Sequence, residues 1–142
     1  MDLEINQTID PVTPAPEFAE QPNAPAGTNV FCSPSDLARL LSALLPAPDP
    51  GIPLFTPQTR RDLAEPVGSS HYSRGGWSLE DNDVTLTHNG DNGRNFAVVF
   101  VEPRRNSALV VMTNVSSPEG KAAVYDMAGT LRDTIRRRGR SN

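Results

Sequence analysis

Cysteine is scarce in this sequence, and its apolar runs are short. Cys32 is the only cysteine among 142 residues, which excludes an internal disulfide and a thiolate metal site, and Cys32 itself is expected to be a small buried apolar residue. No apolar run approaches the roughly 20 residues needed to span a bilayer, so we expect no membrane partner. The first six residues form neither the basic nor the apolar region of a secretion signal. As written, the chain is expected to stay in the cytoplasm, and we expect no metal and no cofactor.

Basic charge is also in short supply. The chain has 13 lysine and arginine residues against 17 acidic ones, for a formal net charge of −4. This balance argues against a nucleic-acid partner. The basic run at residues 136–140 is interpreted as a solvated helix end, because arginines in a last turn favour the negative end of the helix dipole.

Proline, by contrast, crowds the start of the chain. Residues 1–29 hold five of the fourteen prolines, and such a stretch sustains neither a helix nor a central strand. We therefore expect an irregular lead-in at residues 1–29 and one folded domain at residues 30–142. The sequence shows no internal repeat.

Two helix starts follow the lead-in. Ser33 is placed to cap a helix that has Pro34 at its first position and Asp36 as the partner in a capping-box-like pair. Leucines then recur on one helical face up to Pro46, at positions 37, 40, 41, 44 and 45. Thr56-Pro57 repeats the start signal for a short helix that runs to about Ala64.

The period then changes from helical to strand-like. Short strands are predicted at residues 77–79 and 84–88, followed by a continuous apolar strand at 96–101 that is buried on both faces and a return strand at 108–113 after a turn at 103–106. A last helix opens at Ser117 with an apolar stripe at Val124, Met127, Ala128, Leu131 and Ile135. Short connections make the strands antiparallel neighbours, so the sequence predicts an α+β fold with an antiparallel sheet of about four strands packed against helices.

The residues that carry chemistry are concentrated at positions 87–93, Thr-His-Asn-Gly-Asp-Asn-Gly, which are predicted to lie where one strand ends and before the buried strand begins. Gly90 and Gly93 allow a ligand to approach the main chain closely. The simpler interpretation is a glycine-rich hairpin loop whose asparagines only satisfy turn geometry, and composition alone favours it. His88 shares a strand face with apolar residues and is equally compatible with a hydrogen-bonded core histidine.

The order of several segments changes that balance. Pro25-Ala26-Gly27 precedes the helix that contains residues 36–39, Asp-Leu-Ala-Arg. Residues 72–77, Tyr-Ser-Arg-Gly-Gly-Trp, come before Thr87-His88-Asn89-Gly90, and a strand pair joined through Glu102-Pro103 ends at Asn114. From Pro25 to Arg137 this order resembles the C-terminal half of the serine beta-lactamase-related family, which comprises class C beta-lactamases, CubicO-like esterases and penicillin-binding proteins. Ser73 departs from the glycine usual at that position in the family.

The resemblance implies a partial beta-lactamase/transpeptidase-like fold and a set of roles. His88 would replace the lysine of true beta-lactamases opposite the nucleophilic serine, where it would assist proton transfer or donate a hydrogen bond to the substrate. The backbone N–H of Asp91 would be one of two oxyanion-hole donors, although an acidic side chain is odd there. Asn89, Gly90 and Asn92 would line the substrate. Neutral histidine attracts a carboxylate less than an ammonium does, which favours ester, amide or peptide substrates over penicillins. Full-length members are often periplasmic or secreted.

The nucleophile motif of that family is missing. No Ser-x-x-Lys occurs, because Lys121 is the only lysine and no serine stands three residues before it; no Tyr-x-Asn or Ser-x-Asn occurs either. Three hypotheses remain open. The chain is one half of a serine hydrolase that needs an N-terminal half, or a non-catalytic module that binds a small molecule or peptide, or an enzyme that uses Cys32 at the helix start as its nucleophile.

Overall fold

The computed structural model describes residues 32–47, 54–80 and 85–138. The predicted lead-in at 1–29, including Pro25-Ala26-Gly27, and the predicted strand start at Val84 lie outside the described residues. The elements in order are α3 (Pro34–Ser42), α4 (Pro57–Ala64), β1 (Ser78–Glu80), β2 (Thr85–Asp91), β3 (Phe96–Glu102), the short 3₁₀ helix η1 (Pro103–Arg105), β4 (Ser107–Thr113) and α5 (Pro118–Arg138). These confirm an α+β fold.

Helix α3 begins as its sequence predicts. The Ser33 hydroxyl accepts a hydrogen bond from the Asp36 N–H at 3.1 Å and donates one to the Asp36 carboxylate at 2.7 Å, which satisfies an otherwise orphaned N–H of the first turn. After Ser42 the backbone tightens into bonds between residues three apart, from Ala43 to Leu45, before Pro46. Cys32, just before the cap, is exposed, so the expectation of a buried apolar cysteine was wrong.

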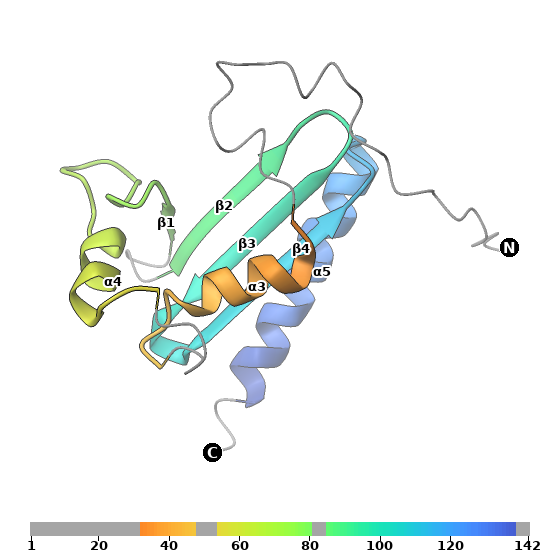
Figure 1. The fold of residues 1–142 in the computed structure, drawn as a ribbon. Helices are drawn as coiled ribbons and strands as arrows, with labels where there is room; N and C mark the ends of the chain where they lie inside the picture. The colour runs from red at the N-terminus through yellow and green to blue at the C-terminus, as the bar shows by residue number, and fades with distance from the viewer. Residues whose placement is uncertain (1–31, 48–53, 81–84, 139–142) are drawn as a thin grey trace, which may run out of the picture. The chain divides into compact units, whose positions relative to one another are not determined.

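The strands form one antiparallel sheet in the order β1-β2-β3-β4 (Figure 1). Each strand follows its neighbour along the chain, so the sheet is a meander, as the short connections predict. Strand β3 pairs along its full length with β4 and from Phe96 to Val101 with β2, so Val99 lies opposite Val110 on one side and opposite His88 on the other. Strand β1 is short and pairs only with residues 85–87 of β2.

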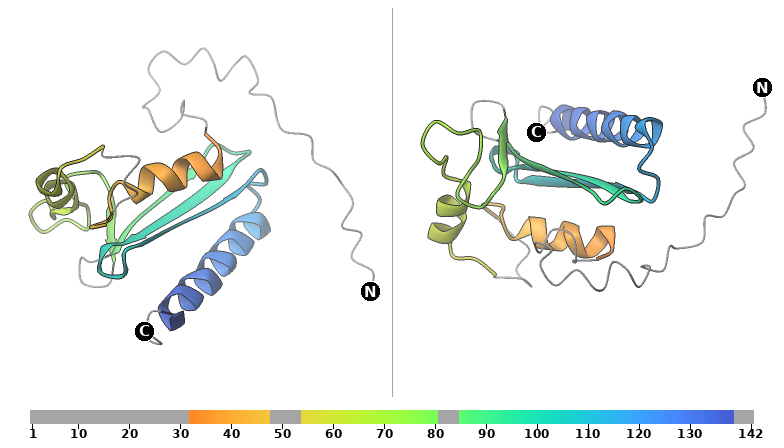
Figure 2. Two further views of the ribbon diagram at one scale, coloured as in Figure 1. Left: turned by 60° about the horizontal axis from the view of Figure 1, so that its bottom comes forward. Right: turned by 90° about the horizontal axis from the view of Figure 1, so that it is seen from above.

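Helices cover both faces of this sheet, with α3 on one side and α5 on the other (Figure 2). We call these the α3 face and the α5 face. On the α3 face, leucines at the end of α3 and just after it pack against alternate residues of the sheet, in a cluster of Leu41, Leu44, Leu45, Leu79, Leu86, Val99 and Val101. On the α5 face a second cluster unites Phe96, Val98, Phe100, Val124 and Ala128. Both faces of β3 are therefore buried, which is why its sequence reads as a continuous apolar run.

The apolar stripe predicted for α5 is only partly buried. Val124 and Ala128 are buried against the sheet, whereas Met127 is 52% exposed and Leu131 is 37% exposed. Residues 127 and 131 lie about 100° and 60° around the helix from Ala128, since each residue turns an α-helix by about 100°. The sheet that α5 contacts is thus too narrow to cover the whole stripe.

No helix among the described residues is both long and apolar enough to cross a membrane.

Candidate functional site

The His-Asn-Gly segment lies inside a strand and not in a loop. Strand β2 continues to Asp91, four residues beyond the stretch that β1 covers. On the other side, His88, Asn89, Gly90 and Asp91 all pair with β3. The predicted strand end was therefore wrong, because the ladder with the strongly apolar β3 outweighs the low strand propensity of asparagine, glycine and aspartate. What remains open here is the outer edge of β2, which faces no other described strand from His88 onward.

The alternation of the antiparallel ladder decides which backbone groups face that open edge. The Leu79 N–H donates to the His71 carbonyl, so the backbone N–H and C=O of Leu79 point away from β2. The backbone groups of its neighbours Ser78 and Glu80 therefore point toward β2. The backbone groups of their partners Thr87 and Thr85 point toward β1. Asn89 and Asp91 follow at the same two-residue interval, so their backbone groups point toward the open edge. The Asn92 N–H bonds to the Asn95 carbonyl, which agrees with this alternation at the hairpin end. The N–H of Asp91 thus points out of the sheet edge.

The His88 side chain lies on the α3 face, two residues beyond buried Leu86. Its ring meets the Trp77 ring edge to face, with centroids 6.4 Å apart and planes at 89°. Trp77 itself packs partly buried against the α3-face cluster. His88 is otherwise exposed, so it is not the enclosed core histidine that its apolar strand neighbours allowed.

The carboxylate of Asp91 is on the opposite side, toward α5. It forms an ion pair with Lys121 and accepts hydrogen bonds from the Ser116 hydroxyl and from the Gly93 N–H, the last at 2.8 Å. Hydrogen bonding to Lys121, then to Ser116 and Gly93, lowers the pKa of Asp91 to about 2. The Asp91 carboxylate is therefore held in its ionised form on the α5 side, while the Asp91 N–H faces the open edge.

The other three predicted site residues have separate roles. Asn89 donates from its side-chain amide to the Tyr125 hydroxyl at 2.9 Å, on the α5 side. Gly90 pairs with Ala97, and a Cβ atom built on it would meet no described atom within 4 Å, so the strand is uncovered at this point. The Asn92 side chain accepts from the N–H groups of Arg94 and Asn95 at 3.1 and 2.7 Å. Asn92 shapes the hairpin, which is the simpler of its two interpretations.

The hairpin that follows is tight. Gly93 has a φ of 80°, and Arg94 is not among the residues with positive φ. That combination is typical of a two-residue type II′ turn, which has glycine at its first central position. The turn keeps β2 and β3 in register as far as Asp91, and so fixes which side of the sheet each site residue faces.

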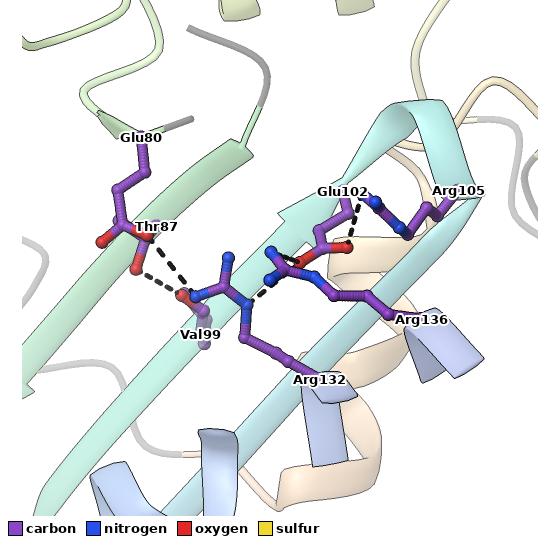
Figure 3. Close-up of polar contacts among 7 residues, drawn as sticks. All are labelled: Glu80, Thr87, Val99, Glu102, Arg105, Arg132 and Arg136. Carbon is purple, nitrogen blue, oxygen red and sulfur yellow. Dashed lines mark hydrogen bonds and ion pairs between the residues drawn. The ribbon is translucent and has the colours of Figure 1, made fainter. Parts of the chain in front are cut away.

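Sequence reasoning missed a second polar cluster, centred on Glu102 at the far end of β3 (Figure 3). Glu102 is only 4% exposed, and its carboxylate contacts Arg132 at 3.0 Å, Arg136 at 3.1 Å and Arg105 at 3.3 Å. The Arg132 guanidinium also lies 4.1 Å from the centre of the Phe100 ring. The available signal was a glutamate that ends a buried apolar run, with two arginines four residues apart on the last helix.

This second cluster joins structural elements and lies apart from the His88 edge. A shallow pocket beside it is lined by residues of β3, β4 and α5, namely Phe100, Glu102, Ser107, Ala108, Leu109, Arg132 and Ile135. Among the described residues, no group of three histidine, cysteine, aspartate or glutamate side chains could hold a metal ion.

No family model, curated protein or solved structure matches this chain.

Proposed function

We propose that this chain is the C-terminal part of a beta-lactamase-related serine hydrolase and supplies one wall of its active site. In this proposal β2 contributes the His88 imidazole on its α3 face and the Asp91 backbone N–H at its outer edge, and a second polypeptide or segment contributes the nucleophilic serine and its base. The expected substrates are esters, amides or peptides.

The observation that carries the proposal is the direction in which β2 presents its side chains and backbone groups. His88 presents an exposed ring on the α3 face, and three residues later the Asp91 N–H points out of the open edge while its carboxylate is tied to α5. An oxyanion hole needs a backbone donor that is unoccupied and rigidly held, next to a group that can move a proton. Gly90 between the two leaves room for a substrate backbone.

An imidazole at this place suits proton transfer better than permanent attraction of an anion, because it can both accept and donate a proton. His88 would therefore act on the serine or leaving group, with Trp77 limiting the freedom of its ring. The Asp91 N–H would stabilise the developing oxyanion, a contribution whose loss typically costs about 100- to 1,000-fold in rate.

The test is to sequence the DNA beside this reading frame for Ser-x-x-Lys and Tyr-x-Asn codons, and then to mix the encoded half with this chain and an activated ester. Hydrolysis that requires both polypeptides, and that His88→Ala reduces at least about a hundredfold, supports the proposal. His71→Ala is the matched control, because His71 is exposed and its backbone carbonyl, not its ring, bonds Leu79. Hydrolysis that is indifferent to His88 would contradict the assigned role.

One observation favours a second candidate, a non-catalytic module that binds a peptide or acyl group. Lys121 is the only lysine in the sequence and is ion-paired with Asp91, so it is not a free base for a nucleophile within this chain. Under this alternative the β2 edge would bind an extended peptide through main-chain hydrogen bonds. Saturable binding of a fluorescent acyl-peptide probe, weakened by His88→Ala and without turnover, would support the module over the hydrolase half.

A further inference from the structure

The opposite edge of the sheet, the outer side of β4, also faces no strand among the described residues. The alternation described for β2 continues across the sheet, so Val98 and Phe100 turn toward β4, and their partners Val111 and Leu109 turn toward β3. The residues in between therefore turn their N–H and C=O groups outward; these are Ala108, Val110 and Met112. No other described strand pairs with them.

This edge lacks the features that usually protect an edge strand. Its sequence, Ser-Ala-Leu-Val-Val-Met-Thr, contains no charge and no proline over seven residues. Natural edges are commonly blunted by lysine, proline, bulges or short length, because an unprotected edge pairs with other strands. The composition of β4 is instead typical of a strand in the interior of a sheet.

Both covering helices are placed as though the sheet continued past β4. Helix α3 contacts β4 more than any other strand, and α5 contacts β4 more extensively than β3. A helix with side chains is about 10–12 Å wide, whereas strands are about 4.8 Å apart, so one helix covers about two strands. Since each helix meets β4 most closely, part of its width lies beyond the last described strand.

The side chains of α5 support the same geometry. Lys121, Tyr125 and Arg132 reach toward β2 and β1, where they contact Asp91, Asn89 and Glu80. Met127 and Leu131 lie on the other flank of α5, the flank toward the β4 edge, and are the exposed members of its apolar stripe. A strand added beside β4 would place its α5-side residues under these two side chains.

We propose that the outer edge of β4 binds one extended, uncharged apolar strand of another polypeptide, which enters between α3 and α5. The complementarity is one of charge as well as shape, because a charged side chain on either face would be buried among apolar atoms without a partner. The incoming strand must be apolar on both faces, as is typical of strands covered by helices on both sides.

A second copy of this chain does not fit that place. An antiparallel pair of β4 strands would bring two α3 helices together on one face of the joined sheet, because each α3 lies closest to its own β4, and strands are only about 4.8 Å apart whereas packed helices need about 8–10 Å between axes. A single strand without its own covering helix avoids this clash. The proposal concerns β4 only, and it stands or falls independently of the role assigned to His88.

The test uses a synthetic strand as the probe, a seven-residue peptide of valine and leucine with lysines at both ends for solubility. Added to the full chain, it should slow amide hydrogen exchange at Ala108, Val110 and Met112 by about tenfold or more, while Leu109 and Val111, already bonded to β3, change little. Val110→Pro removes one outward N–H without breaking the ladder to β3 and should weaken binding at least about tenfold. Val110→Thr keeps the N–H and is its matched control.

A second variant keeps the test valid should Val110→Pro fail to fold. Met127→Glu changes an exposed residue on the flank above the incoming strand and should also weaken binding, whereas Leu54→Glu, at a residue exposed to a similar extent elsewhere, should not. Binding that both Val110→Pro and Met127→Glu leave intact would overturn the proposal. So would protection of the three outward amides before the probe is added, whether the chain is then a monomer or twice its 15.3 kDa mass, because the edge would already be occupied by the chain itself or by a second copy.

Discussion

Replacing Glu102 by glutamine tests whether the arginine cluster holds β3 and α5 together. The carboxylate side chain is 5% exposed, and its two α5 partners are 16% and 31% exposed, so the pairs are partly shielded from solvent. Breaking a fully buried ion pair by removing one partner costs about 3–5 kcal/mol, and exposed pairs are worth about 1 kcal/mol or less. With arginines of intermediate exposure and one neutral hydrogen-bond acceptor retained, Glu102→Gln should lower the free energy of unfolding by about 2–3 kcal/mol.

Urea denaturation measures this loss directly. With a slope of about 2 kcal/mol per molar urea, the midpoint should fall by about 1–1.5 M with no change in slope. Glu80→Gln is the control, because Glu80 is 45% exposed and lies 3.5 Å from the same Arg132, so its loss should cost less than about 0.5 kcal/mol. Equal effects of the two substitutions would refute the argument from burial.

Three further outcomes follow from contacts in the structure. Leu41→Ala should destabilise the fold by about 2–5 kcal/mol and its neighbour Leu40→Ala by less than about 0.5, by chemical denaturation, because the former is 0% and the latter 48% exposed. An NMR titration should find the Asp91 carboxyl pKa near 2, and Lys121→Gln should raise this pKa toward 3.8. Because the pKa of Asp91 is lower in the folded than in the unfolded chain, its ionised carboxylate stabilises the fold above about pH 3.8. This stabilisation is lost as the pH falls through about 2. Ser33→Ala should cost about 1 kcal/mol through the lost cap of α3, and a change below a few tenths in a thermal melt would contradict the capping geometry.

Much of the fold could be predicted from the sequence because its local signals agree with one another. Ser33 and Thr56 cap the helices they precede, and the run beginning at Phe96 is buried on both faces as its composition indicates. The prediction failed where tertiary context decides. Periodicity alone could not reveal that Met127 and Leu131 are exposed, since a helical stripe shows which side chains are apolar but not how wide a surface lies beneath them.

The candidate site shows the same division. His88 and the segment around it were identifiable by residue type. Their placement inside β2 depends on pairing with β3, which cannot be predicted from asparagine and glycine because both have low strand propensity. The Asp91 side chain points toward α5 and the Asp91 N–H toward the open edge because backbone groups alternate along the antiparallel ladder. Which residues face which side could be assigned only once the strand register was known. Glu102 was hidden because Arg132 and Arg136, about 30 residues farther along the sequence, meet it only in the folded chain, whereas Arg105 is its near neighbour in sequence.

The alternation along β2 also makes this segment far less tolerant of changes in length than of changes in residue type. Deleting or inserting one residue between Leu86 and His88 would exchange the two faces for every later position of β2. The imidazole would then turn toward Tyr125, the carboxylate would lose Lys121, and the amide at the open edge would belong to a neighbouring residue. Two such changes within the segment, one deletion and one insertion, would restore the arrangement, so length variation here is expected only in compensated pairs, while the hairpin tip at Gly93 and Arg94 is free to lengthen.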